Sequence, residues 1–89
     1  MITNKSMIFE GHVGQVNSIC FSGDGKMLVS CSDDATIIFW DSETGEKLGE
    51  PLLMHNSGVN CICLSPDGKY IIAGSEDQTI SITKLDIVD

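Results

Sequence analysis

Short apolar runs separated by turn-forming residues dominate the chain. Their positions are 16–22, 27–32, 36–41, 59–65, 70–75 and 79–84. Each run has the length of a β-strand and is rich in the residues that strands favour, chiefly Val and Ile. Nothing along the chain shows an amphipathic helical period over a useful length. The pattern therefore predicts an all-β fold.

A turn signal stands between the first two runs of each group. In the second group, Pro66 presets φ for the first central position of a turn, Asp67 tolerates the second, and Gly68 can adopt positive φ. Residues 22–26 hold the equivalent turn in the first group. Both segments therefore predict antiparallel hairpins.

A weaker fourth run covers residues 46–53 and is interrupted by Gly49 and Pro51. Because proline has no N–H to donate to a ladder, this run is expected to be an outer edge strand. The preceding run, 36–41, is apolar on both faces, which indicates burial between two neighbouring sheets. We therefore expect a four-stranded sheet from the first group.

The two groups are copies of one another. Residues 11–41 recur at 54–84 with an offset of 43 and no gap, and 13 of the 31 positions are identical. Self-similarity at a period of about 40–45 residues is typical of blade-type repeats. One such repeat cannot bury its apolar faces alone, so each copy needs a neighbour.

Charge limits the classes of partner. Five lysines, no arginine and 13 acidic residues give a net charge of −8 over 89 residues. Nucleic acid and anionic membranes need clustered basic residues, so both are disfavoured, whereas a basic protein or peptide suits this surface. No stretch approaches the ~20 apolar residues of a membrane span, and the N-terminus has no run of signal-peptide length.

The four cysteines, Cys20, Cys31, Cys61 and Cys63, give no pair with CxxC spacing, and only two histidines accompany them. This argues against a zinc site, and no other metal or cofactor site is expected. We expect buried, reduced thiols, as in a protein of the cytoplasm, with the nucleus as the alternative location.

The residues of the first copy carry a family resemblance. Its motif positions are Gly11-His12, Val16, Ile19, Phe21, the turn 23–25, Leu28, Ser30, Ser32, Asp34, Thr36-Ile37 and Trp40-Asp41. With them the chain resembles the WD-repeat β-propellers over residues 5–85. The period and the linker 43–52 also look like the long, regular arrays of large fungal signalling proteins.

The resemblance implies a partial propeller of two four-stranded antiparallel blades. Residues 1–10 would hold the outer strand of a neighbouring or closing blade, within Lys5–Glu10. Residues 11–53 would form the first repeat. Residues 54–89 would form a degenerate, incomplete second repeat that lacks its own outer strand.

The resemblance also implies a buried hydrogen-bonded tetrad of His12, Ser30, Asp34 and Trp40, with a structural role rather than a catalytic one. Only His55 and Asp77 remain in the second copy, where Ala73 replaces the serine and Thr83 the tryptophan. Because losing a Trp-sized buried side chain costs about 3–5 kcal/mol, we expect the second blade to be the less stable.

Proteins of this kind are mostly non-catalytic scaffolds that bind partners around the central channel. The positions that the resemblance implies, which we call the rim, are Gln15, Asn17, Asp33, Gly58, Asn60 and Glu76. We therefore expect a protein-interaction scaffold in signalling or complex assembly, and no enzyme. The alternatives are a unit that closes a ring by homo-oligomerisation, part of a larger propeller, or a truncated product without independent function.

Overall fold

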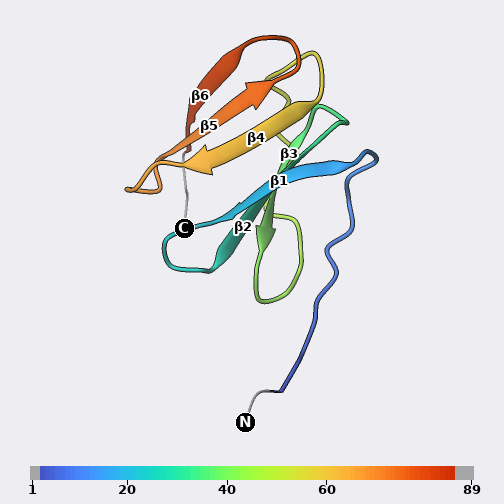
Figure 1. Ribbon diagram of the computed structural model, residues 1–89. Coiled ribbons are helices and arrows are strands. Elements are labelled where there is room, and N and C mark those ends of the chain that lie inside the picture. The colour runs from blue at the N-terminus through green and yellow to red at the C-terminus, as the bar shows by residue number, and fades with distance from the viewer. Residues whose placement is uncertain (1–2, 86–89) are drawn as a thin grey trace.

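Two antiparallel sheets make up the computed structural model, which describes residues 3–85 (Figure 1). Sheet A contains β1 (Val16–Phe21), β2 (Met27–Ser32) and β3 (Ile37–Asp41), in that order. Sheet B contains β4 (Val59–Leu64), β5 (Tyr70–Ser75) and β6 (Ile80–Lys84). The described residues form no helix, so the all-β prediction is confirmed.

Each sheet has three strands, so the prediction of four-stranded blades is wrong in that detail. Residues 46–52 do follow β3, but only through two isolated bridges, Ile37–Leu52 and Trp40–Lys47. Between these bridges, Gly49 has a φ of +76° and leaves the extended region, and Pro51 has no N–H to donate. The outer run therefore stays beside β3 without forming a continuous ladder.

The N-terminal segment also differs from expectation, because residues 5–10 form no strand. The segment is held by a side chain instead: the Phe9 ring packs on Trp40 with ring centroids 5.6 Å apart and planes 66° apart. Its assignment to a neighbouring blade remains a prediction. The last part of the expected second repeat, residues 86–89, lies outside the described residues.

The two sheets share one register. Cys20, Val29 and Phe39 stand opposite one another in sheet A, and residues 63, 72 and 82 repeat this row in sheet B. The predicted hairpin turns are confirmed, with Gly25 at φ +73° and Gly68 at φ +72°. Opposite residues project to the same side of a sheet, so the register also says which residues share a face.

The core lies between the two sheets, where β1 lies against β4 (Figure 1). It consists of Val29, Cys31 and Ile37 from sheet A, and of Val59, Ile62, Ile71 and Ala73 from sheet B. Burying one such aliphatic side chain contributes about 1.5–3 kcal/mol. The expected double burial holds for β3, because Ile37, Ile38 and Trp40 are all buried.

Candidate functional site

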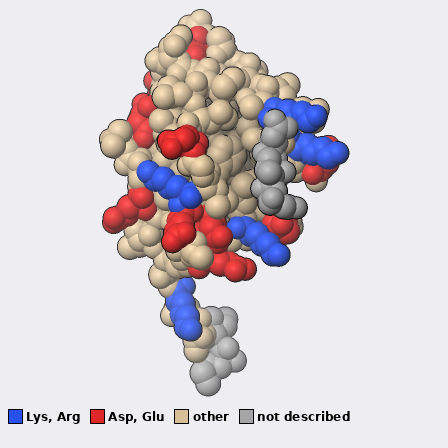
Figure 2. Space-filling model, turned by 180° about the vertical axis from the view of Figure 1, so that it is seen from behind, with Lys and Arg blue, Asp and Glu red and all other residues tan. Residues whose placement is uncertain are grey.

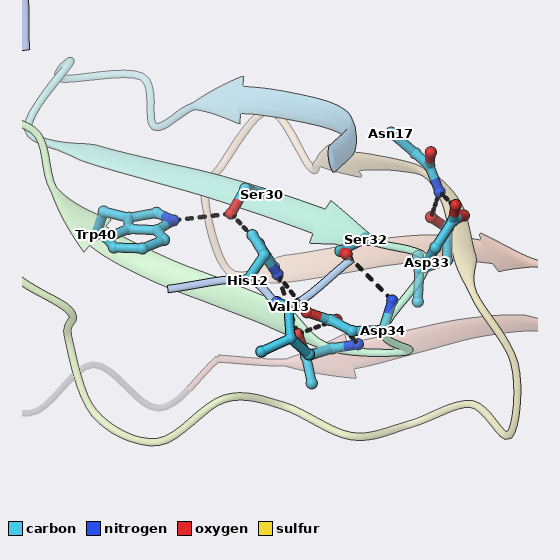
Figure 3. A network of polar contacts seen from close by, with 10 residues as sticks. His12, Val13, Asn17, Ser30, Ser32, Asp33, Asp34 and Trp40 are labelled. Carbon is cyan, nitrogen blue, oxygen red and sulfur yellow. Dashed lines mark hydrogen bonds and ion pairs between the residues drawn. The ribbon is translucent and has the colours of Figure 1, made fainter. Parts of the chain in front are cut away.

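A chain of hydrogen bonds joins the N-terminal segment to sheet A (Figure 3). The Trp40 indole N–H donates to Ser30 Oγ at 2.8 Å, and Ser30 Oγ lies 2.6 Å from His12 Nε2. At the other side of the imidazole, His12 Nδ1 lies 3.1 Å from Asp34 Oδ2. A carboxylate only accepts, so the Nδ1 proton faces Asp34, and the Ser30 hydroxyl donates to Nε2. The structure thus brings His12, Ser30, Asp34 and Trp40 together.

Asp34 is anchored from several directions. Its Oδ2 accepts the Val13 N–H at 3.0 Å, and its Oδ1 accepts the N–H of Thr36 at 2.8 Å and the Thr36 hydroxyl. Burial alone would raise the pKa of Asp34, but the bonds from Thr36, Val13 and His12 outweigh it and hold this pKa well below its usual value. The carboxylate is therefore ionised at neutral pH.

The order Ser30–His12–Asp34 is that of a hydrolytic triad, and its surroundings decide against catalysis. Ser30 is buried, and its Oγ already accepts the Trp40 N–H. The His12 and Asp34 side chains are buried as well. A nucleophile needs an open face toward the substrate carbonyl and a group that stabilises the oxyanion. The arrangement instead fixes residues 12–13 onto sheet A.

Sheet B holds a second network that uses a residue the sequence interpretation missed. His55 Nδ1 lies 3.1 Å from Asp77 Oδ2, and His55 Nε2 lies 2.9 Å from Ser81 Oγ. Ser81 stands opposite Ala73, which occupies the repeat position of Ser30. In sheet A the corresponding pair is Ser30 opposite Ile38. The hydroxyl has therefore moved to the neighbouring strand, and cross-strand comparison of the two copies is the signal that could have found it.

The turn after β5 supports Asp77 as the turn after β2 supports Asp34. The Thr79 hydroxyl and the N–H groups of Thr79 and Asn56 donate to its carboxylate. The Thr79 hydroxyl is the largest influence on the pKa of Asp77, and these bonds together hold it well below its usual value, although desolvation opposes them. Thr36 is one of the motif positions and Thr79 is its identical repeat partner, but the sequence did not assign either hydroxyl to a network.

Three rim residues meet at the joint between the sheets. Asn17 Nδ2 donates to Asp33 Oδ1 at 2.7 Å and to the Val59 carbonyl at 2.9 Å (Figure 3). Gly58 packs against Asp33 so closely that an added Cβ would lie 3.0 Å from Asp33 Cα. The register shifts at Asn17 and again at Asn60, and such a bulge turns its side chain away from the regular row.

The other three rim residues, Gln15, Asn60 and Glu76, are exposed. The Asp33 N–H donates to the Gln15 carbonyl at 2.9 Å, and the Glu76 N–H donates to the Gly58 carbonyl at 3.0 Å. These backbone bonds place the turns of both sheets at the same end as the starts of β1 and β4. The exposed side chains of Gln15, Asn60 and Glu76 therefore lie at this end.

The thiols split into two pairs. Cys31 is buried and Cys20 half-buried, and burial raises the pKa of both thiols, that of Cys31 to about 11. Cys61 and Cys63 are exposed, contrary to the burial expected for all four, because they lie on the outer face of sheet B. No three His, Cys, Asp or Glu side chains among residues 3–85 are grouped to hold a metal. Within that part, no helix has the length and apolarity to cross a membrane.

Comparisons with known proteins agree with this architecture. Zebrafish (Danio rerio) ribosome biogenesis protein bop1 is 44% identical over 46 residues, which are 52% of this chain and 6% of that protein. A component of mouse (Mus musculus) chromatin assembly factor 1 is 42% identical over 38 residues, 43% of this chain and 7% of that protein. The matched part of this chain thus spans less than a tenth of these relatives.

The solved structure of U3-55K is similar with a TM-score of 0.82 and 28% identity, covering 88% of this chain and 25% of that one. The family model "WD domain, G-beta repeat" matches twice, over residues 3–41 and 46–83. This chain therefore belongs to the WD-repeat family.

Proposed function

We propose that the chain is a non-catalytic scaffold module that binds a Lys- or Arg-bearing segment of another protein at its rim. One observation carries the proposal: the repeat-equivalent carboxylates Asp33 and Glu76 are both exposed at the same end of the two sheets. Two carboxylates in matching places present neighbouring binding points to a basic segment. The net charge of −8 favours the approach of such a partner.

The rim residues have different tasks in this proposal. Asn17 and Gly58 hold the sheets together through Asp33. Asn60 and Glu76 are exposed and supply the partner contacts, together with the exposed Gln15. Reversing the charge of Asp33 would break the joint as well as the contact, so Glu76 is the residue to change.

The process in which the module works is part of the proposal. The names of the relatives concern ribosome biogenesis and chromatin assembly. They favour assembly of large complexes over signalling, and a nuclear location over the cytoplasm. Since the chain spans a small part of those proteins, their whole activities are not transferred to it.

A charge-matched pair of variants tests the rim. Glu76→Lys is compared with Glu43→Lys, which makes the same change in net charge at the exposed turn after β3, at the other end of sheet A. The probe is a fluorescein-labelled peptide of alternating Lys and Ala, followed by anisotropy. We expect Glu76→Lys to weaken binding severalfold more than Glu43→Lys, with equal melting temperatures. Equal weakening by both variants would mean that the attraction depends on net charge alone, and it would overturn the proposal that the rim binds the peptide.

A further inference from the structure

Sheets A and B meet at an interface that we call the closed joint. The same residue pattern recurs on two exposed faces, and we call the interface that these faces could form the open joint. Val29, Cys31 and Ile37 line one side of the closed joint, and Ile62, Ile71 and Ala73 line the other. Because the two copies share one register, every residue of the closed joint has a partner 43 positions away. These partners lie on the two outer faces of the molecule, one on each sheet.

The outer face of sheet B matches the covered face of sheet A. Ile80 is the repeat partner of Ile37, and it is 76% exposed where Ile37 is 1% exposed. Ile82 follows two residues later on the same face of β6, where it stands in the row Cys63–Ile72–Ile82, and it is exposed as well. Seen from behind, the uppermost surface of the molecule is largely uncharged (Figure 2). Apart from Lys84, which stands opposite Tyr70 at one end, the outer face of sheet B is apolar and has the residue pattern that sheet B covers within the chain.

The outer face of sheet A matches the covered face of sheet B. Val16 is 49% exposed and Ile19 is 59% exposed, whereas their repeat partners Val59 and Ile62 are 0% and 8% exposed. Phe21 continues the same face and is exposed. An exposed face of this kind on a small protein marks an interaction surface. The chain thus carries both halves of one interface, pointing outward from opposite sides.

The open joint has equivalents of the residues that make a polar contact across the closed joint, divided between its two faces. In the closed joint, Asn17 Nδ2 donates to Asp33 Oδ1 and to the Val59 carbonyl, and we call this polar contact the clamp. Asn60 and Glu76 are the repeat partners of Asn17 and Asp33 and are exposed. The carbonyl equivalent to that of Val59 belongs to Val16, at the edge of the outer face of sheet A. Asn60 of one copy is therefore matched to the Val16 carbonyl of another.

The open joint is not a full replica of the closed one. Gln15 occupies the repeat position of Gly58, where a Cβ would come 3.0 Å from the backbone of residue 33. Glu76 is also one methylene longer than Asp33. Both changes hold the backbones farther apart at this edge. The joint between copies is therefore weaker than the joint within one chain.

We propose that copies of this chain associate head to tail, with the outer face of sheet B of one copy covering the outer face of sheet A of the next. The interface is heterologous, so each copy keeps one free face until a ring closes. Each copy carries a charge of −8, so like charges oppose this association. Screening by salt weakens that repulsion and tightens the association.

Sedimentation of the 89-residue chain at micromolar concentration tests the proposal, because a single copy has a mass of 9.6 kDa. We expect species of two or more copies, with a larger share at higher salt. Ile82→Lys and Phe21→Lys each place a charge on one outer face at an exposed position. Val13→Lys is the control, because Val13 is exposed and its repeat partner Asn56 is exposed beside the closed joint.

Mixing the two variants distinguishes head-to-tail association from general stickiness. Ile82→Lys keeps the sheet A face and Phe21→Lys keeps the sheet B face, so each alone should stop at weak association. An equimolar mixture should form a 1:1 dimer that cannot grow further. Trp40 fluorescence and circular dichroism show that each variant is folded, and Ile80→Lys and Ile19→Lys serve as second choices on the same faces.

Asn60→Ala measures the clamp. It should weaken association about two- to tenfold, the value of one hydrogen bond, without changing the melting temperature of the monomer. A wild-type chain that stays a folded monomer at all concentrations overturns the proposal, as further blades or another partner would then cover both faces. So does association that neither lysine variant reduces, or a mixture that yields no dimer.

Discussion

The two sheets share register, turns and a His–Asp pair, yet they differ in the last strand of each sheet and in the segment that precedes the sheet. In sheet A, Trp40 is buried under Phe9, and a Cβ at Gly11 would lie only 2.8 Å from the Trp40 ring. In sheet B, Thr83 replaces the tryptophan, and Met54 occupies the place of Gly11. A large ring requires a small neighbour, and its loss admits a larger one. Substitutions between the copies thus come in spatial groups.

Replacing the tryptophan should give the largest difference in stability between a variant in sheet A and its counterpart in sheet B. Trp40→Ala removes a buried ring and the donor to Ser30, and is expected to cost about 3–5 kcal/mol of unfolding free energy. Thr83→Ala, at the repeat position in sheet B, should cost less than about 1 kcal/mol. Urea unfolding followed by circular dichroism measures both, because Trp40 is the sole tryptophan. Similar losses would mean that the ring carries little of the first blade's stability.

The displaced hydroxyl gives the second test. Ser30→Ala and Ser81→Ala each leave an imidazole nitrogen without its partner and should cost about 1–3 kcal/mol. Adding Ala73→Ser to Ser81→Ala returns a hydroxyl to the strand that carries it in sheet A. We expect the double variant to recover part of the loss in a melting experiment. Lack of any recovery would show that the two strand positions are not interchangeable.

A third change should affect both sheets alike. Ala35 and Gln78 are repeat partners, and both have a φ of +71°, a region that glycine adopts without a steric penalty. Ala35→Gly and Gln78→Gly should each stabilise the chain by about 1 kcal/mol. Thermal melts of both single variants test this. A gain in only one sheet would show that the turns are less equivalent than their angles indicate.

Lowering the pH should have a smaller effect on stability near neutrality than the substitutions above. It should also destabilise both sheets. The pKa values of Asp24, Asp34, Asp67 and Asp77 all lie below their usual values. Each of these carboxylates therefore stabilises the fold above its unfolded pKa of about 3.9, and this contribution is lost as the pH falls from about 5 through the folded pKa. Melting temperatures between pH 7 and pH 3 measure the slope.

Variants of two of these carboxylates test which groups cause the dependence of the melting temperature on pH. Replacing Asp34 and Asp77 together with Asn should flatten the dependence of the melting temperature on pH, and Glu50→Gln, at an exposed position, is the control. An unchanged slope in the Asp34→Asn/Asp77→Asn variant would place the acid sensitivity elsewhere.

Much of the fold followed from the sequence because the relevant signals are local. The turns at Gly25 and Gly68 and the alternation within each run determined the hairpins. The missing fourth strand could not be predicted from Pro51 alone, because one proline is compatible with an edge strand, whereas the +76° φ of Gly49 ends the ladder. Likewise, the joint of Asn17, Asp33 and Val59 depends on how two sheets dock, which no single repeat specifies.

The candidate site shows the same division. His12, Ser30, Asp34 and Trp40 could be named because the first copy matches the motif of the family that it resembles, and the resemblance implies the tetrad. The role of Ser81 was not predicted because it depends on which residue stands opposite on the neighbouring strand. An alignment of the two repeats compares equivalent positions along the chain and does not show such cross-strand pairs. Exposure of Cys61 and Cys63 escaped for a related reason, since a strand position does not say which of its faces finds a neighbour.

The position of Ser81 also makes the two strand positions depend on each other. Loss of the hydroxyl from one strand leaves the Nε2 of His55 without its partner unless the opposite strand carries a hydroxyl as well. A chain with serine at both places should therefore tolerate the later loss of either one.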